Sequence, residues 1–198
     1  MAAFYGTGRA DVFIATDECD QFYINNQGDR IIGGGAGDVV SSSIDYTLDD
    51  GISYLVLTGR AIIGTGNDTQ NNIIGNNQDN ILNGGRGIDR LKGGGGSDTF
   101  VFDAGGRANA DYVMDFTSGV DRLAISGSAF GVTAGVSFDY VENWSNLGSG
   151  PTFIRENIDD LAPTIWFDSD GVGGKPAQIL CTLQWKNNST VATDFAII

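Results

Sequence analysis

Aspartate recurs every nine residues in the first part of this chain, and this spacing is the feature that most restricts its fold. The first block holds one aspartate at each step: Asp11, Asp20, Asp29 and Asp38. Two positions beyond each aspartate stands an apolar residue with the same period: Phe13, Phe22, Ile31 and Val40. Repeats of fixed length are typical of solenoids, in which each repeat stacks on its neighbours to bury a continuous core.

The period fades over residues 41–58 and returns in a sharper form. Residues 84–92 (GGRGIDRLK) and 93–101 (GGGGSDTFV) both read GGxGxDxUx, where U is a large apolar residue. Less regular turns precede them at residues 33–38, 64–68 and 75–81. Glycine accounts for 30 of the 198 residues, which fits repeated tight turns that need positive φ angles.

This nonapeptide resembles the repeat of the RTX (repeats-in-toxin) family of hemolysin-type calcium-binding proteins. The resemblance implies an all-β fold, a parallel β-roll whose turns hold several Ca²⁺ ions. It also divides the chain into four parts. These are a first β-roll block (1–40), a non-repeat insertion (41–58), a second β-roll block (59–102) and a β-rich C-terminal cap (103–198).

The geometry of the repeat explains why calcium suits it. Six residues form a turn and three form a strand, so one coil takes two repeats and the turns that stack on each other are two repeats apart. Each pair of stacked turns then presents two carboxylates and several glycine carbonyls to one ion. Ca²⁺ accepts six to eight oxygens in a flexible geometry, whereas Mg²⁺ gives up its water reluctantly. We therefore expect one ion between Asp11 and Asp29 and another between Asp20 and Asp38.

The pairing in the second block is less regular. Asp79 and Asp98 are separated by one position more than two repeats and are expected to stack. Asp89 has two candidate partners upstream, Asp68 and Asn71, because the register there is open. The sequence therefore predicts that the turns of this block also hold ions, with the exact pairs left to the structure.

The candidate metal ligands are turn aspartates and turn glycines. Asp111 enters through the resemblance, because the cap of the family often contributes a carboxylate to the last calcium. The alternative is that the aspartates only form Asx turns, which weighs most for Asp20, whose turn has no glycine. The predicted set is Asp11, Asp20, Asp29, Gly33, Gly35, Asp38, Gly64, Gly66, Asp68, Asp79, Gly84, Gly85, Gly87, Asp89, Gly93, Gly94, Gly96, Asp98 and Asp111.

The glycine period stops after residue 102. Residues 111–116 and 121–125 predict a strand, a turn and a strand, and residues 164–167 and 177–183 predict a second strand pair. These segments look like the cap that follows RTX repeats in serralysin-type proteases, which covers the apolar interior of the last coil. The same resemblance makes the final residues, DFAII, a signal for an ABC-type (type I) exporter, with a plain edge strand as the alternative.

Composition excludes several classes of protein. The chain has no histidine, which rules out imidazole zinc sites and Ser-His-Asp chemistry. Its formal net charge of −14 disfavours nucleic acid and anionic membranes as partners. No apolar run reaches the length of a membrane span, and the start lacks the pattern of a secretory signal. Cys19 and Cys181 are expected to be separate small apolar residues, with a bridge between them as the alternative.

We therefore expect a secreted, extracellular calcium-binding β-roll protein or module without enzymatic activity. In this interpretation it leaves the cell through an ABC-type exporter and folds on binding extracellular Ca²⁺. The alternative is a carbohydrate- or cell-surface-binding module on a calcium-stabilised scaffold. Three tryptophans are candidate stacking platforms for that role, with packing in the core as the alternative for at least two of them: Trp144, Trp166 and Trp185.

Overall fold

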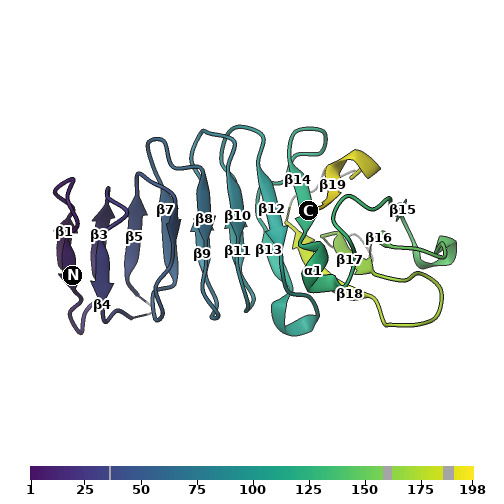
Figure 1. Ribbon diagram of the computed structural model, residues 1–198, viewed down its shortest axis with the longest axis horizontal. Coiled ribbons are helices and arrows are strands. Elements are labelled where there is room, and N and C mark those ends of the chain that lie inside the picture. Colours follow the sequence, from purple (N-terminus) through teal and green to yellow (C-terminus); the bar gives the residue numbers. More distant parts are fainter. Residues whose placement is uncertain (36, 158–161, 185–189) are drawn as a thin grey trace.

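The computed structural model describes residues 1–35, 37–157, 162–184 and 190–198. Its strands stack as successive coils along one long axis, from the N-terminus at one end to a wider C-terminal part at the other (Figure 1). Helical residues in the described chain form one short α-helix, α1 (Gly127–Phe130), and the 3-10 turns η1 (Arg107–Asn109), η2 (Trp144–Asn146) and η3 (Ala192–Asp194). The predicted all-β parallel β-roll is confirmed.

The strands form two long sheets and one short one within the described residues. The first sheet has the order β1 (Ala3–Tyr5), β3 (Gln21–Ile24), β5 (Val39–Ser42), β7 (Tyr54–Leu57), β9 (Asn72–Ile74), β11 (Arg90–Lys92), β13 (Asp111–Val113), β18 (Gln178–Leu183), β17 (Thr164–Asp168), β16 (Thr152–Glu156), β15 (Asp139–Val141). The second has the order β19 (Phe195–Ile197), β14 (Arg122–Ile125), β12 (Thr99–Phe102), β10 (Ile81–Asn83), β8 (Ile63–Thr65), β6 (Tyr46–Thr47). The short sheet pairs β2 (Val12–Ile14) with β4 (Arg30–Ile32).

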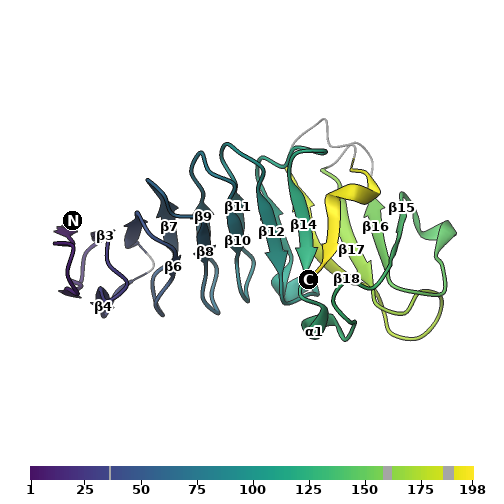
Figure 2. The ribbon, with the colours of Figure 1, turned by 45° about the horizontal axis from the view of Figure 1, so that its top comes forward.

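The parallel register reproduces the two-repeat coil that the sequence predicts. Ala3 pairs with Gln21, Ile81 pairs with Thr99, and Asn72 pairs with Arg90, each separated by two full repeats. Because each coil makes one strand in each layer, successive repeats alternate between the first sheet and the layer that faces it, which is the short sheet in the first block and the second sheet from β6 on. Every turn therefore lies at one of two long edges of the roll (Figure 2).

Residues 41–58 interrupt the nine-residue spacing but contribute strands to both sheets. Val39 of β5 pairs with Tyr54 of β7, which makes this coil three residues shorter than two repeats. Tyr46 of β6 pairs with Gly64 of β8 at the usual separation of two repeats. The stacking of coils thus passes through this segment in the first sheet, and the second sheet begins within it.

The coils at the C-terminal side of the repeats are longer. Arg90 pairs with Tyr112 and Thr99 pairs with Arg122, so these coils exceed two repeats by four and five residues. The two segments expected as a strand, a turn and a strand therefore do not form a hairpin. β13 continues the first sheet and β14 continues the second.

The C-terminal part closes both sheets with strands that are distant in sequence. β18 pairs with β13 in parallel and with β17 in antiparallel fashion, so the expected strand pair near the C-terminus forms. The final strand β19 pairs with β14, which joins Leu123 to Phe195. The end of the described chain is therefore an edge strand of the second sheet (Figure 2).

The core lies between the sheets as ladders of apolar side chains. In the first sheet the ladder joins residues that the register places directly opposite one another: Phe4, Phe22, Val40, Leu55, Ile73, Leu91, Val113 and Leu183. The facing ladder includes Leu82, Phe100 and Leu123, all fully buried. Stacking the same position of every repeat thus buries a continuous apolar interior, as the period predicts.

Two further features bear on the sequence-based expectations. Both cysteines are free; Cys19 is exposed and Cys181 is buried in β18. The stretches that the structure describes contain no helix with the length and apolar character needed to cross a membrane.

Candidate metal centre

The sixth residue of each turn contacts the turn that lies one coil earlier. An Oδ atom of Asp29 accepts the Asp11 N–H at 3.0 Å, and an Oδ atom of Asp38 accepts the Asp20 N–H at 2.7 Å. The structure thus brings together the two aspartate pairs expected in the first block. The carboxylates lie at the edge of the roll, where backbone N–H and carbonyl groups of the turns converge.

The second block follows the same rule with different partners. Asp89 accepts the Asn71 N–H at 2.7 Å, and Asp98 accepts the Asn80 N–H at 2.8 Å. Of the two candidates for the upstream partner of Asp89, the structure selects Asn71. Asp111 continues the series, because its carboxylate accepts the Asp89 N–H at 2.9 Å.

Three residues of the predicted set do not occupy the places expected for them. Asp68 and Asp79 are exposed, because the turns run over 66–71 and 75–80 and leave asparagine at the sixth position. Asp79 instead accepts the Ser97 N–H at 2.7 Å. Gly64 is buried within β8 at a core position, where an added Cβ would lie 3.2 Å from Leu57 Cδ1. The turn expected to begin near Gly64 lies later in the sequence, because Gly64 takes the core position that a large apolar residue occupies in the other repeats.

The aspartates of the first block have both carboxylate oxygens occupied by hydrogen bonds. The second oxygen of Asp11 accepts the Thr7 N–H at 2.6 Å, and that of Asp20 accepts the Thr16 N–H at 2.6 Å. The Thr16 N–H is the main reason that the pKa of Asp20 is lowered. Asp29 and Asp38 likewise accept N–H groups within their own turns. The carboxylate oxygens of these aspartates therefore have hydrogen-bond donors within the protein. Calcium binding by these four residues stays a prediction.

The aspartates of the second block are placed differently. Asp89 is fully buried, and its Oδ2 atom has no hydrogen-bond partner. A buried carboxylate oxygen without a partner is costly, and such atoms in native proteins call for a metal ion, a water or a proton. Gly84 packs so closely on this oxygen that a Cβ at residue 84 would overlap it. Gly93 has the same relation to Oδ2 of Asp98.

Burial without a counterion raises the pKa of these carboxyl groups. Desolvation raises the pKa of Asp98 to about 6, that of Asp89 to about 7 and that of Asp111 to about 8. Nearby like charges add to the rise, including Asp103 beside Asp89 and Asp111. A cation at this edge would reverse both causes, since it supplies opposite charge and oxygen ligation.

Glycines shape the same turns. Gly85 and Gly94 have φ angles of 83° and 100°, in the left-handed region that favours glycine. A Cβ on Gly85 would lie 2.6 Å from the Asn67 carbonyl oxygen, so the two turns approach closely only because the side chain is absent. The other predicted glycines also lie in turns: Gly33, Gly35, Gly66, Gly84, Gly87, Gly93 and Gly96.

The donor set fits a hard cation that accepts backbone oxygens. Among the residues that the structure describes, no three acidic or cysteine side chains converge on one point. An ion between these turns would therefore take most of its oxygens from backbone carbonyls, with one or two carboxylates. Calcium accepts such mixed sets, whereas zinc requires nitrogen or sulfur ligands for tight sites.

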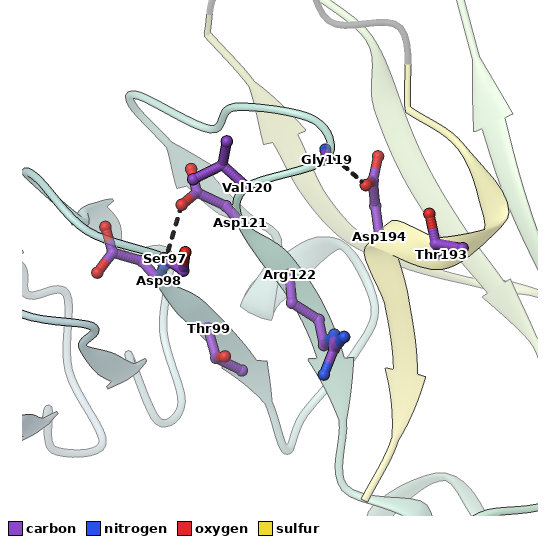
Figure 3. Close-up of a pocket in the computed structure, with 9 residues that line it drawn as sticks. All are labelled: Ser97, Asp98, Thr99, Gly119, Val120, Asp121, Arg122, Thr193 and Asp194. Atoms are coloured by element: carbon purple, nitrogen blue, oxygen red, sulfur yellow. Dashed lines mark hydrogen bonds between the residues drawn. The ribbon is translucent and has the colours of Figure 1, made fainter.

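Sequence reasoning missed Asp121. Its carboxylate accepts the Asp98 N–H at 2.9 Å (Figure 3). Asp121 therefore continues the row of turn carboxylates from Asp98 into the next coil. The regular period does not reach Asp121, because the coil that carries it is five residues longer than two repeats. The local signal survives: Asp121 stands two residues before the buried Leu123, as the turn aspartates stand before their apolar residues.

Asp121 also lines a pocket of about 410 Å³ between the last repeat and the C-terminal segment (Figure 3). Asp194 closes the pocket, and its carboxylate accepts the Gly119 N–H at 2.9 Å and the Ser118 hydroxyl at 2.7 Å. This buried aspartate therefore ties the end of the chain to the loop of the last long coil.

Two of the three tryptophans predicted as sugar platforms are in contact on the C-terminal part. The rings of Trp144 and Trp166 lie edge to face with centroids 5.4 Å apart. Each indole N–H donates to a different oxygen of Glu156 at 3.0 Å. Trp185 lies outside the described residues. Polysaccharide binding by these side chains stays a prediction.

Comparison with protein families agrees with this geometry. Residues 33–195 match the family described as Peptidase M10 serralysin C terminal. The match spans the second block, the long coils and the C-terminal strands, and it is the RTX repeat-containing, non-catalytic region of serralysin-type peptidases. No curated protein matches the chain. On the extent of the family match, this chain belongs to the peptidase M10 serralysin C-terminal family.

Proposed function

We propose that this chain is a calcium-dependent β-roll that is exported through an ABC-type (type I) system and completes its folding outside the cell. The observation that carries the proposal is Oδ2 of Asp89, a buried carboxylate oxygen without a hydrogen-bond partner. It lies in a GGxGxD turn, directly beneath the turn that carries Asp111.

The residues that would hold calcium are those of the second block together with Asp111, which belongs to the coil that follows it. Asp89, Asp98 and Asp111 offer carboxylates whose raised pKa values follow from burial without a counterion. The backbone carbonyls of residues 84–87 and 93–96 offer the remaining oxygens. Calcium, when bound, supplies the positive charge that this edge lacks. Asp20 and Asp38 are weaker candidates, because hydrogen bonds already occupy their oxygens.

Linkage explains how such sites serve export. The chain has a formal net charge of −14, so its carboxylates repel one another when the coils close without cations. Calcium that binds only the folded coils stabilises them by mass action, and millimolar concentrations suit the weak sites of extracellular modules. In calcium-poor surroundings the coils with carboxylate turns stay open, which keeps that part of the chain extended for export. Members of this family are typically exported by type I secretion, which supports the same route for this chain.

The test is a calcium titration of chelator-stripped protein followed by far-UV circular dichroism, with MgCl₂ as the control. We expect a cooperative gain of β signal with CaCl₂ and none with MgCl₂ at the same concentration. A complete β spectrum in chelator that calcium leaves unchanged would refute calcium-dependent folding. Export is tested separately, by measuring whether a host with an ABC-type exporter releases the chain and retains it when residues 194–198 are deleted.

A further inference from the structure

Two adjacent turns in the middle of the roll carry asparagine where the next two carry glycine and aspartate. Turns 66–71 (GNDTQN) and 75–80 (GNNQDN) have asparagine at the second and sixth positions. Turns 84–89 (GGRGID) and 93–98 (GGGGSD) have glycine and aspartate at those positions. Both positions change together, which indicates that the two asparagines of a turn act as a unit.

In the first of these turns, the amides close the space to the turn one coil earlier. Asn71 is fully buried, and its side-chain oxygen accepts the Asn67 N–H at 2.8 Å. The side-chain NH₂ of Asn67 donates to the carbonyl oxygens of Asp49 and Ile52, both at 2.9 Å. The NH₂ of Asn71 approaches the same Ile52 oxygen at 3.4 Å. Two amide groups thus converge on the backbone carbonyls of the preceding turn.

The second turn repeats this arrangement at the opposite edge of the roll. Asn80 is 1% exposed, and its NH₂ lies 3.2 Å from the Ala61 carbonyl oxygen and 3.3 Å from that of Ile62. The NH₂ of Asn76 donates to the Ala61 oxygen at 2.8 Å. The side-chain oxygen of Asn80 accepts the Asn76 N–H at 2.8 Å, which fixes the amide orientation. The contact is therefore built into the turn and is not a chance approach.

An amide NH₂ and a calcium ion compete for the same partners. Both need carbonyl oxygens, and the carbonyls of Ile52 and Ala61 already accept amide protons. The NH₂ groups also place partial positive charge where a cation would lie. A buried amide whose donors and acceptor are satisfied stabilises the contact without any metal. At Asp89 the situation is the reverse, because a carboxylate oxygen is buried there without a donor.

We propose that Asn67, Asn71, Asn76 and Asn80 hold the central coils together in place of calcium and so decide which turns of the roll take the ion. The second half of this statement rests on the proposed function, whereas the amide contacts do not. Strands β8, β9 and β10 then form a metal-independent base (Figure 1). The coils that begin with β11 and β12 order on that base when calcium arrives.

Hydrogen–deuterium exchange of the full chain, in chelator and in CaCl₂, tests this proposal. The variant is Asn80→Asp, which replaces the amide donor with a carboxylate at the same buried place. The matched control is Asn77→Asp, which adds the same charge to the same turn at an exposed residue. In wild-type protein in chelator, we expect backbone amides of β8 and β10 to exchange at least about tenfold more slowly than those of β11 and β12. Asn80→Asp should abolish that difference, and Asn77→Asp should preserve it.

Two results would overturn the proposal. One is wild-type protein in which β8 and β10 exchange in chelator as fast as β11 and β12, while calcium slows the exchange of β11 and β12. The other is an Asn80→Asp variant that exchanges as slowly as the Asn77→Asp control. Failure of the proposed function looks different, because β11 and β12 would then exchange at the same rate with and without calcium. Even then, the comparison of the two variants in chelator decides whether the amides hold the central coils.

Discussion

Replacing Asp89 with asparagine should destabilise the folded protein in calcium but should not destabilise it in chelator. The amide oxygen of the new side chain can still accept the Asn71 N–H, which Asp89 accepts at 2.7 Å. The change removes the negative charge and one carboxylate oxygen from a fully buried position. It therefore deletes a calcium ligand in one condition and a costly buried charge in the other.

The expected size follows from linkage. Extracellular calcium modules bind with dissociation constants of about 10⁻⁴ to 10⁻³ M, so 10 mM calcium stabilises the folded state by about 1.4 to 2.7 kcal/mol per ion. For a chain of this size, loss of one ion should lower the melting temperature by roughly 3 to 11 °C. In chelator the sign changes, because burial raises the pKa of Asp89 to about 7 and the folded state gains when the charge is removed.

Thermal unfolding followed by circular dichroism in 10 mM CaCl₂ and in chelator measures both signs. Asp68→Asn is the matched control, since Asp68 is an exposed aspartate of a neighbouring turn and loses the same charge. We expect Asp89→Asn to melt lower than wild type in calcium and no lower in chelator, with Asp68→Asn close to wild type in both. Equal destabilisation of Asp89→Asn in the two conditions would show that the carboxylate is structural only and would refute the calcium assignment.

Two further predictions concern pH and the glycine turns. The pKa values of Asp89 (about 7) and Asp111 (about 8) exceed the ordinary 3.8, so the cost of ionising them in the folded state is complete above pH 8 and shrinks as the pH falls towards 4. In chelator the melting temperature should thus be higher at pH 5 than at pH 8. In calcium the order should reverse, because protons compete with the ion for the carboxylates. A melting temperature in chelator that does not change between these pH values would contradict this prediction. Gly94→Ala should lower the melting temperature more than Gly95→Ala does. Gly94 has a φ of 100°, and an added Cβ would collide with the Asn76 carbonyl oxygen. Equal melting temperatures of the two variants would contradict this explanation of the turn.

The nine-residue period predicts the fold class because its information is local. A turn of six residues and a strand of three fix the coil at two repeats, and the register of Ile81 with Thr99 follows directly. The same period places apolar residues such as Leu82 and Phe100 in the interior, because each coil repeats the previous one. No long-range information is needed where every contact is with the neighbouring coil.

The period also predicts where most of the turn carboxylates lie, but it does not predict which carboxylate oxygens lack a hydrogen-bond donor. Asp20 and Asp89 both stand at the sixth place of a turn. Thr16 donates its backbone N–H and its hydroxyl to Asp20, whereas no donor reaches Oδ2 of Asp89. Whether a carboxylate is available to calcium therefore depends on the packing of the turn around it.

Coil length was decided by tertiary structure. The short coil between β5 and β7 and the long coils after β11 and β12 break the spacing on which the sequence reading depends. For this reason Asp121 was missed and Asp79 was assigned a place that Asn80 occupies.

The nonapeptide by itself determined a parallel β-roll with carboxylate turns, because a repeat that stacks on itself encodes its own neighbours. Only the tertiary structure decided how the roll ends, as when Phe195 pairs with Leu123 although the two are far apart in the chain. It also decided which turns are closed by amides and which leave a carboxylate oxygen without a donor. Those outcomes depend on contacts between segments that share no period, and their geometry is fixed by packing, not by spacing.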